Sequence, residues 1–325
     1  ARPEGRFSIT SRSELHGLGR RANVITMTDL THYSGQAIER AGGRRKDSDW
    51  IAQQLASPGA RLVPIWRGLS LLNGESAAHI PAADAWHLLE GAPAEPVFLG
   101  IDEVGALFAL DLSHLDEDDA ARLAPGAAFQ ELYGVATQLV RREASLLSHA
   151  AWMIHWTRRH RFCGACGYPT MGHEAGHVRA CTNADCGILH FPRTDPAVIV
   201  VVEHDNHCLL AHQKGWPGRL HSCVAGFVEP GESAEEAVVR EVKEESGITV
   251  HSVRSFGSQP WPYPCSLMLG FYAEADDGMI TLDDDELAEA RWFSRDQLRD
   301  PDLDIELPRH DSIARRLIDE WVARG

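Results

Sequence analysis

A dense run of glutamates in residues 226–248, GFVEPGESAEEAVVREVKEESGI, is the stretch most suggestive of chemistry. Within this run, Pro230 and Gly231 form a turn and Gly247 stands near the end, which predicts a helix between them that carries Glu241, Glu244 and Glu245 on one arc beside its apolar stripe. Arg240 lies one turn before Glu244, where its guanidinium can orient a carboxylate. Partly buried carboxylates are costly unless a cation neutralises them, and oxygen ligands favour Mg²⁺ or Mn²⁺. A solvated acidic helix is the alternative.

Four cysteines form a second group, in CGAC and, fourteen residues later, CTNADC. They are Cys163, Cys166, Cys181 and Cys186. Two close pairs in tight turns suit a tetrahedral Zn²⁺, and four sulfur ligands leave no open position for water. We therefore expect a structural zinc with no catalytic role. Two disulfides, or a redox dithiol at CGAC, are the alternatives, and the reducing compartment that seven cysteines suggest disfavours them.

These groups need elements to position them. Apolar runs at 60–72, 96–112 and near 198–202 predict strands, and helical spacing covers much of residues 127–160. A chain of 325 residues is too long for one ordinary core. We expect an N-terminal α/β domain over residues 1–160, a zinc ribbon over 161–192, and a third domain over 193–325 that contains the acidic helix.

Composition limits the partners. The hydrophobic share of 44% and charged share of 24% predict a globular protein, and no apolar run approaches the roughly 20 residues that span a bilayer. The net charge of −16 repels nucleic acid and anionic membranes. The first residues lack the apolar core of a secretory signal, so we expect a cytoplasmic protein without a membrane partner.

The acidic segment resembles the Nudix box. That pattern is Gly, five residues, Glu, seven residues, Arg-Glu, a bulky aliphatic, one residue, Glu-Glu, one residue, Gly and an aliphatic. The sequence meets each position with Gly226, Glu232, Arg240, Glu241, Val242, Glu244, Glu245, Gly247 and Ile248. The resemblance implies an α/β/α sandwich with a mixed sheet, and metal-assisted hydrolysis of a nucleoside diphosphate linked to another moiety.

A proline-rich loop, SQPWPYPCS at 258–266, narrows the substrate. Taken alone it could be a rigid structural loop with a buried tryptophan. It is similar, however, to the signature of the NADH pyrophosphatase branch, with tyrosine in place of one phenylalanine. The four-cysteine unit and FPRTDPAVI (191–199) are also typical of that branch. The resemblance implies substrate contacts from Gln259, Pro260, Trp261, Pro262, Tyr263, Pro264, Cys265 and Ser266.

The branch implies cleavage of NAD(H) to nicotinamide mononucleotide and AMP, and removal of NAD caps from RNA. Glu241 and Glu245 become the principal Mg²⁺ or Mn²⁺ ligands with Glu244 beside them, and Glu245 the residue that positions or deprotonates water. The carbonyl of Ala225 is a further ligand. Family members have a further metal-binding glutamate later in the chain, and Glu286 in DDDELAEARWF stands at the matching place. Asp285 and Glu289 are near enough to be alternatives.

The resemblance also implies how the ring of the dinucleotide is held. Phe227 stacks on nicotinamide, and a second aromatic at the position of Phe191 comes from the partner subunit, so a homodimer is expected. Ala314 matches a substrate-contacting position. Gly176 stands where the family has a glutamate, so that contact is expected to be absent. The second cysteine pair is spaced more widely than is usual, which alters the expected zinc geometry.

Two alternatives remain open from the sequence. One is a Nudix hydrolase of another nucleoside diphosphate derivative, such as ADP-ribose. The other is a zinc-ribbon RNA-binding protein whose hydrolase site is idle, which the net charge of −16 and the intact box disfavour.

Overall fold

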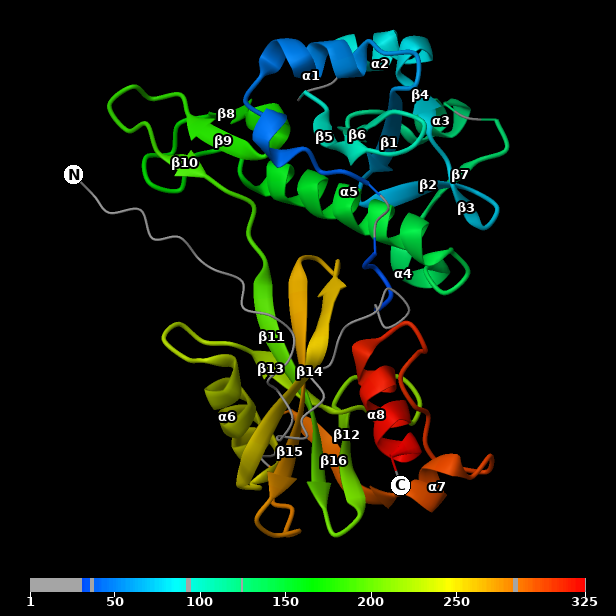
Figure 1. Cartoon of the computed structure of the whole chain (residues 1–325), viewed down its shortest axis with the longest axis vertical. Helices are drawn as coiled ribbons and strands as arrows, with labels where there is room; N and C mark the ends of the chain where they lie inside the picture. Colours follow the sequence, from blue (N-terminus) through cyan, green and yellow to red (C-terminus); the bar gives the residue numbers. More distant parts are fainter. Residues whose placement is uncertain (1–30, 36–37, 92–94, 124, 283–285, 325) are drawn as a thin grey trace, which may run out of the picture. The chain divides into compact units, whose positions relative to one another are not determined.

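The computed structural model describes residues 31–35, 38–91, 95–123, 125–282 and 286–324 (Figure 1). The first thirty residues of the expected N-terminal domain lie outside this described part, and so does Asp285.

The N-terminal domain is built on one mixed sheet of seven strands (Figure 1). The strands are β1 (Arg61–Trp66), β2 (Leu69–Asn73), β3 (Ser76–Ala77), β4 (Ile80–Pro81), β5 (Val97–Ile101), β6 (Ala106–Asp111) and β7 (Ala128–Gln130). They follow the order β3-β2-β1-β6-β5, with β4 beside β1 and β7 beside β2, and β1 runs parallel to β6. The apolar run at 60–72 is a hairpin because Arg67 and Gly68 have φ values of 51° and 89°, which close a two-residue turn.

Helices cover both faces of this sheet. They are α1 (Ser48–Leu55), α2 (Trp86–Gly91), α3 (Glu117–Arg122), α4 (Leu132–Val135) and α5 (Arg141–Arg159). α5 packs on one face through Leu147 and Ile154, whereas the opposite face buries Leu62 and Phe108 in a second core. The helical prediction for much of 127–160 is confirmed by α4 and α5, but it does not hold at the start of this range. Residues 128–130 instead form β7 at the edge beside β2, a long-range pairing that helical spacing does not report.

A small three-stranded antiparallel sheet follows. Its strands are β8 (Thr170–His173), β9 (Val178–Cys181) and β10 (Leu189–His190), in the order β10-β9-β8. Cys163, Cys166 and Cys186 lie in the segments flanking these strands, and Cys181 is the last residue of β9.

The third domain is a six-stranded mixed sheet between helices. Its strands are β11 (Asp195–His204), β12 (His207–Gln213), β13 (Val224–Phe227), β14 (Val250–Trp261), β15 (Ser266–Ala275) and β16 (Leu287–Ser294). The order is β14-β15-β11-β12-β16, with β13 paired to β11 and with β11 parallel to β15. Its helices are α6 (Ala234–Ser246), α7 (Arg295–Arg299) and α8 (Ile313–Ala323).

The apolar run in β11 explains the sandwich. Successive strand residues point to opposite faces, so a run of aliphatic residues serves two cores at once. Val198 and Val200 pack in the core that includes α6, while Ile199 and Val201 pack in the core that includes α8. The expected α/β/α arrangement with a mixed sheet is confirmed. No helix in the described part of the chain has the length and apolarity needed to cross a membrane.

Candidate functional site

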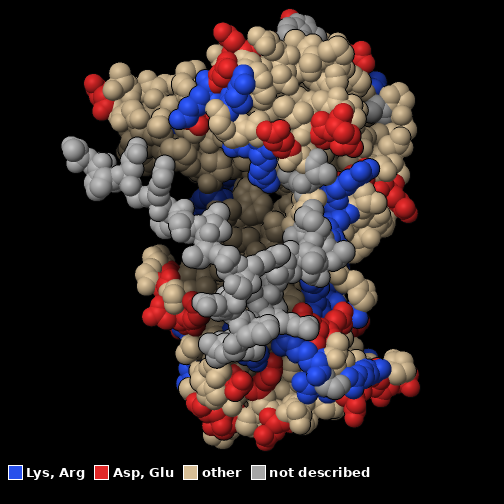
Figure 2. Space-filling view, viewed as in Figure 1, with Lys and Arg blue, Asp and Glu red and all other residues tan. Residues whose placement is uncertain are grey.

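Helix α6 presents the glutamate cluster, and its ends are set by local interactions. Ser233 caps the first turn: its side chain accepts a hydrogen bond from the Glu236 backbone N–H at 3.2 Å, and the Glu236 carboxylate accepts one from the Ser233 N–H at 2.8 Å. Gly247 ends the helix with φ 72°, as the sequence predicted. Figure 2 shows acidic side chains gathered over the α6 region.

Arg240 is the centre of a charged network, and all five of its N–H donors have acceptors. Nε and Nη2 bind the two carboxylate oxygens of Glu232 at 2.6 and 2.9 Å. Nη1 donates to Glu241 at 2.8 Å and to Glu244 at 3.0 Å, and Nη2 also donates to the Phe227 carbonyl at 2.8 Å. A guanidinium has five donors in a rigid plane, so this one residue ties the helix to the preceding loop and orients two glutamates.

Gly226 makes room for Glu241. A Cβ atom added at Gly226 would overlap Cδ and both oxygens of the Glu241 carboxylate. Strand β13 therefore lies directly against this carboxylate, and the Ala225 carbonyl belongs to the same strand. The φ of Gly226 does not lie in the left-handed region, so backbone conformation does not require glycine here. The close approach of the Glu241 carboxylate is what requires it.

The three glutamates differ in environment. The Glu244 side chain is 62% exposed, whereas that of Glu241 is only 12% exposed, and Glu245 is 5% exposed. Glu245 forms no hydrogen bond or ion pair within the described residues. Burial and the nearby charges of Glu241 and Glu286 raise the pKa of Glu245 to about 8. Burial is also the main cause that raises the pKa of Glu241.

These environments fit a divalent cation. Glu245 is a buried carboxyl group with no cationic partner, next to two further carboxylates, and a metal ion would compensate all three. Among the described residues, the four cysteines are the only group of three or more possible metal ligands whose ligand atoms all lie within 4.8 Å of one another. The carboxylates of α6 do not form such a group. Mutual repulsion is expected to hold carboxylates further apart than that until a cation binds between them. Arg240 offsets this repulsion at Glu241 and Glu244 but makes no bond to Glu245.

The cysteine cluster is tightly gathered. The Sγ atoms of Cys163 and Cys186 are 3.8 Å apart, and those of Cys166 and Cys181 are 3.4 Å apart. A disulfide requires about 2.05 Å, so neither pair is bonded, whereas a tetrahedron with Zn–S distances near 2.3 Å has edges of about 3.8 Å. Backbone N–H groups of Ala165 and Cys166 lower the pKa of Cys163 to about 6, which favours the thiolate that binds metal. The wider sequence spacing of Cys181 and Cys186 does not prevent the four Sγ atoms from coming together.

The hairpin of β14 and β15 positions the proline-rich loop, and Gln259 locks its base. This side chain is fully buried. Its Nε2 donates to the carbonyls of Asp311 at 2.7 Å and His32 at 3.2 Å, and its Oε1 accepts from the Ile313 N–H at 2.7 Å. Gln259 therefore joins the loop to the first turn of α8, where Ala314 lies buried, and its amide is fully occupied by backbone groups.

Tyr33 links the N-terminal domain to this loop, a contact that sequence reasoning missed. Its hydroxyl donates to Asp311 Oδ2 at 2.9 Å and lies 3.0 Å from the Tyr263 hydroxyl. Its ring meets Trp261 edge-on at 5.8 Å, and Tyr133 meets Tyr263 in the same way at 5.2 Å. Burial raises the pKa of Tyr33, so it remains a hydroxyl donor at neutral pH. Trp261 and Tyr263 are thus packed at a domain contact, where both are partly buried.

Two domain families match the chain. Residues 193–319 match the NUDIX domain, and residues 59–156 match the NADH pyrophosphatase-like rudimentary NUDIX domain. The chain is 37% identical over 323 residues to the NAD-capped RNA hydrolase NudC of Mycobacterium bovis, which covers 92% of this chain and 98% of the relative. This chain belongs to the Nudix hydrolase family.

Two further Nudix relatives match in part. Identity is 38% over 245 residues to the NAD-capped RNA hydrolase NudC of Stutzerimonas stutzeri, covering 69% of this chain and 86% of the relative. Identity is 40% over 198 residues to the NAD-capped RNA hydrolase NUDT12 of Macaca fascicularis, covering 57% of this chain and 43% of the relative. Nudix hydrolases use divalent metals.

The remaining residues expected from the Nudix resemblance lie in different settings. Phe227 and Phe191 are 60% and 61% exposed, so both rings are free to stack on a ligand. Gly176 has φ 88° and lies against Val97, whose side chain a Cβ would meet at 2.8 Å. A glutamate could not replace it without rearrangement. Glu286 lies just before β16, and its carbonyl accepts from the Lys214 N–H at 2.9 Å.

Proposed function

We propose that this Nudix hydrolase cleaves the pyrophosphate of NAD(H) to NMN(H) and AMP and removes NAD caps from RNA. The observation that carries the proposal is Glu245, a buried carboxyl group without a partner, beside Glu241 and Glu286. The proline-rich loop and the names of the relatives support the choice of dinucleotide.

The metal ligands are proposed from chemistry and position. Glu241, Glu245 and Glu286 would hold Mg²⁺ or Mn²⁺ with help from the Ala225 carbonyl, and Glu244 would complete the cluster at its exposed edge. When bound, the ion supplies Lewis-acid stabilisation of the pyrophosphate oxygens and activation of water. The four cysteines would hold a structural Zn²⁺.

The protein groups have separate tasks in this proposal. Arg240 orients the Glu241 carboxylate and neutralises part of the charge of the cluster, so that its geometry is set before substrate arrives. Glu245 is the proposed residue that positions or deprotonates the attacking water, with its carboxylate oxygen accepting the proton. Phe227 stacks on the nicotinamide ring, and Trp261 and Tyr263 contact the dinucleotide from the proline-rich loop.

A second copy of the chain is the proposed partner. Large apolar side chains are exposed on the zinc ribbon and on the segment that follows it: Phe162, Tyr168, Met171, Leu189 and Phe191 are each more than half exposed. Covering this patch in a homodimer would place Phe191 at a neighbouring site, as the family resemblance implies. Sedimentation of the wild-type chain and of Phe162→Glu tests this, because only the variant should be a monomer.

The seven cysteines are all unpaired, which favours a reducing compartment such as the cytoplasm as the proposed location.

Product analysis tests the catalytic proposal. With Mn²⁺, NADH should give NMNH and AMP, and an NAD-capped RNA should give NMN and a 5′-monophosphate RNA, while Glu245→Gln should give neither. Specific activities on NADH, NAD⁺, ADP-ribose and coenzyme A are measured side by side. A clear preference for ADP-ribose would replace the proposed substrate with that alternative, and binding of uncapped RNA without cleavage would favour an idle hydrolase site.

A further inference from the structure

A group of basic side chains gathers where the segment before α1, helix α5 and the small sheet of β8, β9 and β10 meet. Arg45 follows the short helix η2 (Gly42–Arg44), His149 lies in α5, and His177 follows the short helix η4 (Glu174–Gly176). The rings of His149 and His177 are 6.4 Å apart, and Arg45 Nη1 lies 3.1 Å from His177 Nδ1. None of these residues belongs to the carboxylate or cysteine groups described above.

The partners of the two histidines fix which ring nitrogens carry hydrogen. The Phe98 carbonyl lies 2.7 Å from His177 Nε2 and can only accept, so Nε2–H donates and Nδ1 accepts from Arg45. Arg40 Nη1 lies 3.5 Å from His149 Nε2 and can only donate, so the hydrogen of a neutral His149 ring is on Nδ1. Burial, followed by the charge of Arg40, holds the pKa of His149 well below its usual value, which keeps this ring neutral.

Two N–H groups of this cluster lack an acceptor. Nε of Arg45 and Nδ1 of His149 are both buried, and neither has a hydrogen-bond partner within the described residues. The other bonds of Arg45 go to neutral groups, because Nη2 donates to the Arg40 carbonyl at 3.2 Å and Nη1 donates to His177. A buried donor without a partner is costly, so a ligand that carries acceptor atoms would be bound favourably here.

The charges of the cluster favour an anion. Among the described residues Arg45 forms no ion pair, and the nearby carboxylate of Glu174 pairs instead with Lys46 Nζ at 3.4 Å. Burial and then the charge of Arg40 lower the pKa of Arg45, the direction expected for a partly buried cation without a counter-ion. Arg40 and Lys46 are exposed, so a small ion can reach the cluster from solvent.

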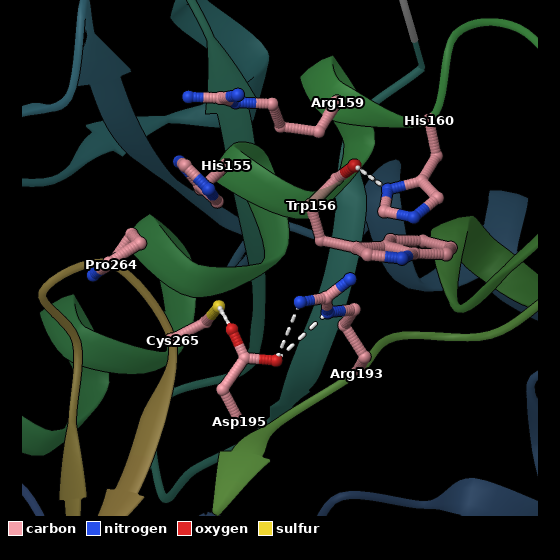
Figure 3. Close-up of a pocket in the computed structure, with 8 residues that line it drawn as sticks. All are labelled: His155, Trp156, Arg159, His160, Arg193, Asp195, Pro264 and Cys265. Carbon is pink, nitrogen blue, oxygen red and sulfur yellow. Dashed lines mark hydrogen bonds and ion pairs between the residues drawn. The ribbon is translucent and has the colours of Figure 1, made fainter. Parts of the chain in front are cut away.

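Other arginines of the chain show the more usual arrangement. In a cavity of about 250 Å³ beside the end of α5, Figure 3 shows the Arg193 guanidinium against the Asp195 carboxylate, to which its Nε donates at 2.9 Å. Arg61 and Arg240 also pair with carboxylates. A basic surface that is merely solvated would not explain buried N–H groups without acceptors around Arg45.

We propose that Arg45 and His149, with Arg40 and Lys46 at the exposed edge, form a binding site for a phosphate group. A phosphate group presents three acceptor oxygens on one centre, so it can accept from both unpartnered N–H groups and from a cation of the edge at the same time. A carboxylate has only two oxygens, and chloride is a single acceptor centre. Two sources supply this chemistry: inorganic phosphate, and the terminal phosphate of a mononucleotide. The site is independent of the proposed function, because binding breaks no bond of the anion.

Arg45→Gln tests the site, and Arg44→Gln is its matched control. Arg44 is the adjacent arginine, but its guanidinium lies over the Trp50 ring at 4.8 Å and donates to Asp47 at 3.2 Å. Calorimetry measures the dissociation constants of inorganic phosphate and of AMP for each full-length protein, with no divalent metal added. We expect Arg45→Gln to weaken phosphate binding at least about tenfold, the loss expected for a charge-assisted hydrogen bond. Arg44→Gln should change it by less than about twofold, as for an exposed charge that already has a partner.

His149→Phe provides a second test, because it keeps an aromatic ring and removes the unpartnered N–H. It should also weaken phosphate binding, and it decides the question if Arg45→Gln does not fold. Thermal unfolding in phosphate-free buffer shows which variants are folded. Added phosphate should then raise the Tm of the wild-type protein and of Arg44→Gln but not that of Arg45→Gln, since only a bound ion stabilises the folded state in this way. Sodium chloride of equal ionic strength should not reproduce the rise.

The two sources give different patterns. Weaker binding of inorganic phosphate to Arg45→Gln, alone or together with weaker binding of AMP, identifies the free ion, whereas a loss confined to AMP identifies the phosphate of a nucleotide. Equal affinities of Arg45→Gln and Arg44→Gln for both ligands, or a rise in Tm that chloride reproduces, would overturn the proposal. Because these measurements need no turnover, a protein that cleaves neither NADH nor capped RNA contradicts the proposed function and leaves this result unaffected.

Discussion

Gly226→Ala should disable the site through a single methyl group. The added Cβ would overlap the Glu241 carboxylate, and Gly226 has no left-handed φ that alanine could not adopt. To restore even a 3.0 Å approach the carboxylate must move by about 1 Å, and displacements of that size in a catalytic group cost about 100-fold in rate. That loss corresponds to about 2.7 kcal/mol of transition-state stabilisation.

The matched control is Gly257→Ala in strand β14 of the same sheet. A Cβ at Gly257 meets no atom within 4 Å, so the same chemical change should leave the site undisturbed. The assay is NADH hydrolysis at saturating Mn²⁺, with zinc content and thermal unfolding measured in parallel. We expect a fall of about 100-fold in kcat for Gly226→Ala and a near-normal rate for Gly257→Ala. A Gly226→Ala rate within a few-fold of wild type, at unchanged stability, would refute the view that Glu241 must lie against β13.

Three further changes test other parts of the site. Arg240→Lys keeps the charge but replaces five planar donors with three on a flexible stem, so NADH turnover should fall at least about tenfold; a wild-type rate would show that charge alone suffices. In metal-depleted protein, folding raises the pKa of Glu245 from 4.5 to about 8. The folded state therefore binds this proton more tightly than the unfolded state does. The resulting stabilisation is complete below pH 4.5 and is lost as the pH rises through 8. The wild-type unfolding free energy should therefore fall relative to Glu245→Gln by up to about 1.4 kcal/mol per pH unit in that window, and parallel denaturation curves would contradict this. Tyr33→Phe removes the hydroxyl that binds Asp311, so KM for NADH should rise a few-fold while kcat and zinc content change little; an unchanged KM would limit Tyr33 to packing.

Features set by local chemistry could be predicted from the sequence. The bounds of α6 follow from the Ser233 cap and from Gly247, which act within a few residues. The apolar run in β11 identified a doubly buried strand, and the spacing of the cysteines identified a cluster that the structure brings together.

Features set by distant packing could not be predicted. Helical rotation puts Glu241 and Glu244 on the same arc, but only Glu241 lies under β13, so one is buried and the other exposed. The bond between Tyr33 and Asp311 joins residues 278 positions apart, with no local signal to announce it. Gln259 was expected to contact substrate, yet its amide binds backbone groups on both sides of the loop, a role that only the folded chain defines.

The most direct measurement is the position of Mn²⁺ in crystals grown with a non-hydrolysable dinucleotide, located by anomalous scattering. An ion bound by Glu241 and Glu245, with pyrophosphate oxygens completing its coordination, is the predicted result. An ion bound elsewhere, with Glu245 still buried and unliganded, would contradict the assignment of α6 as the catalytic metal site.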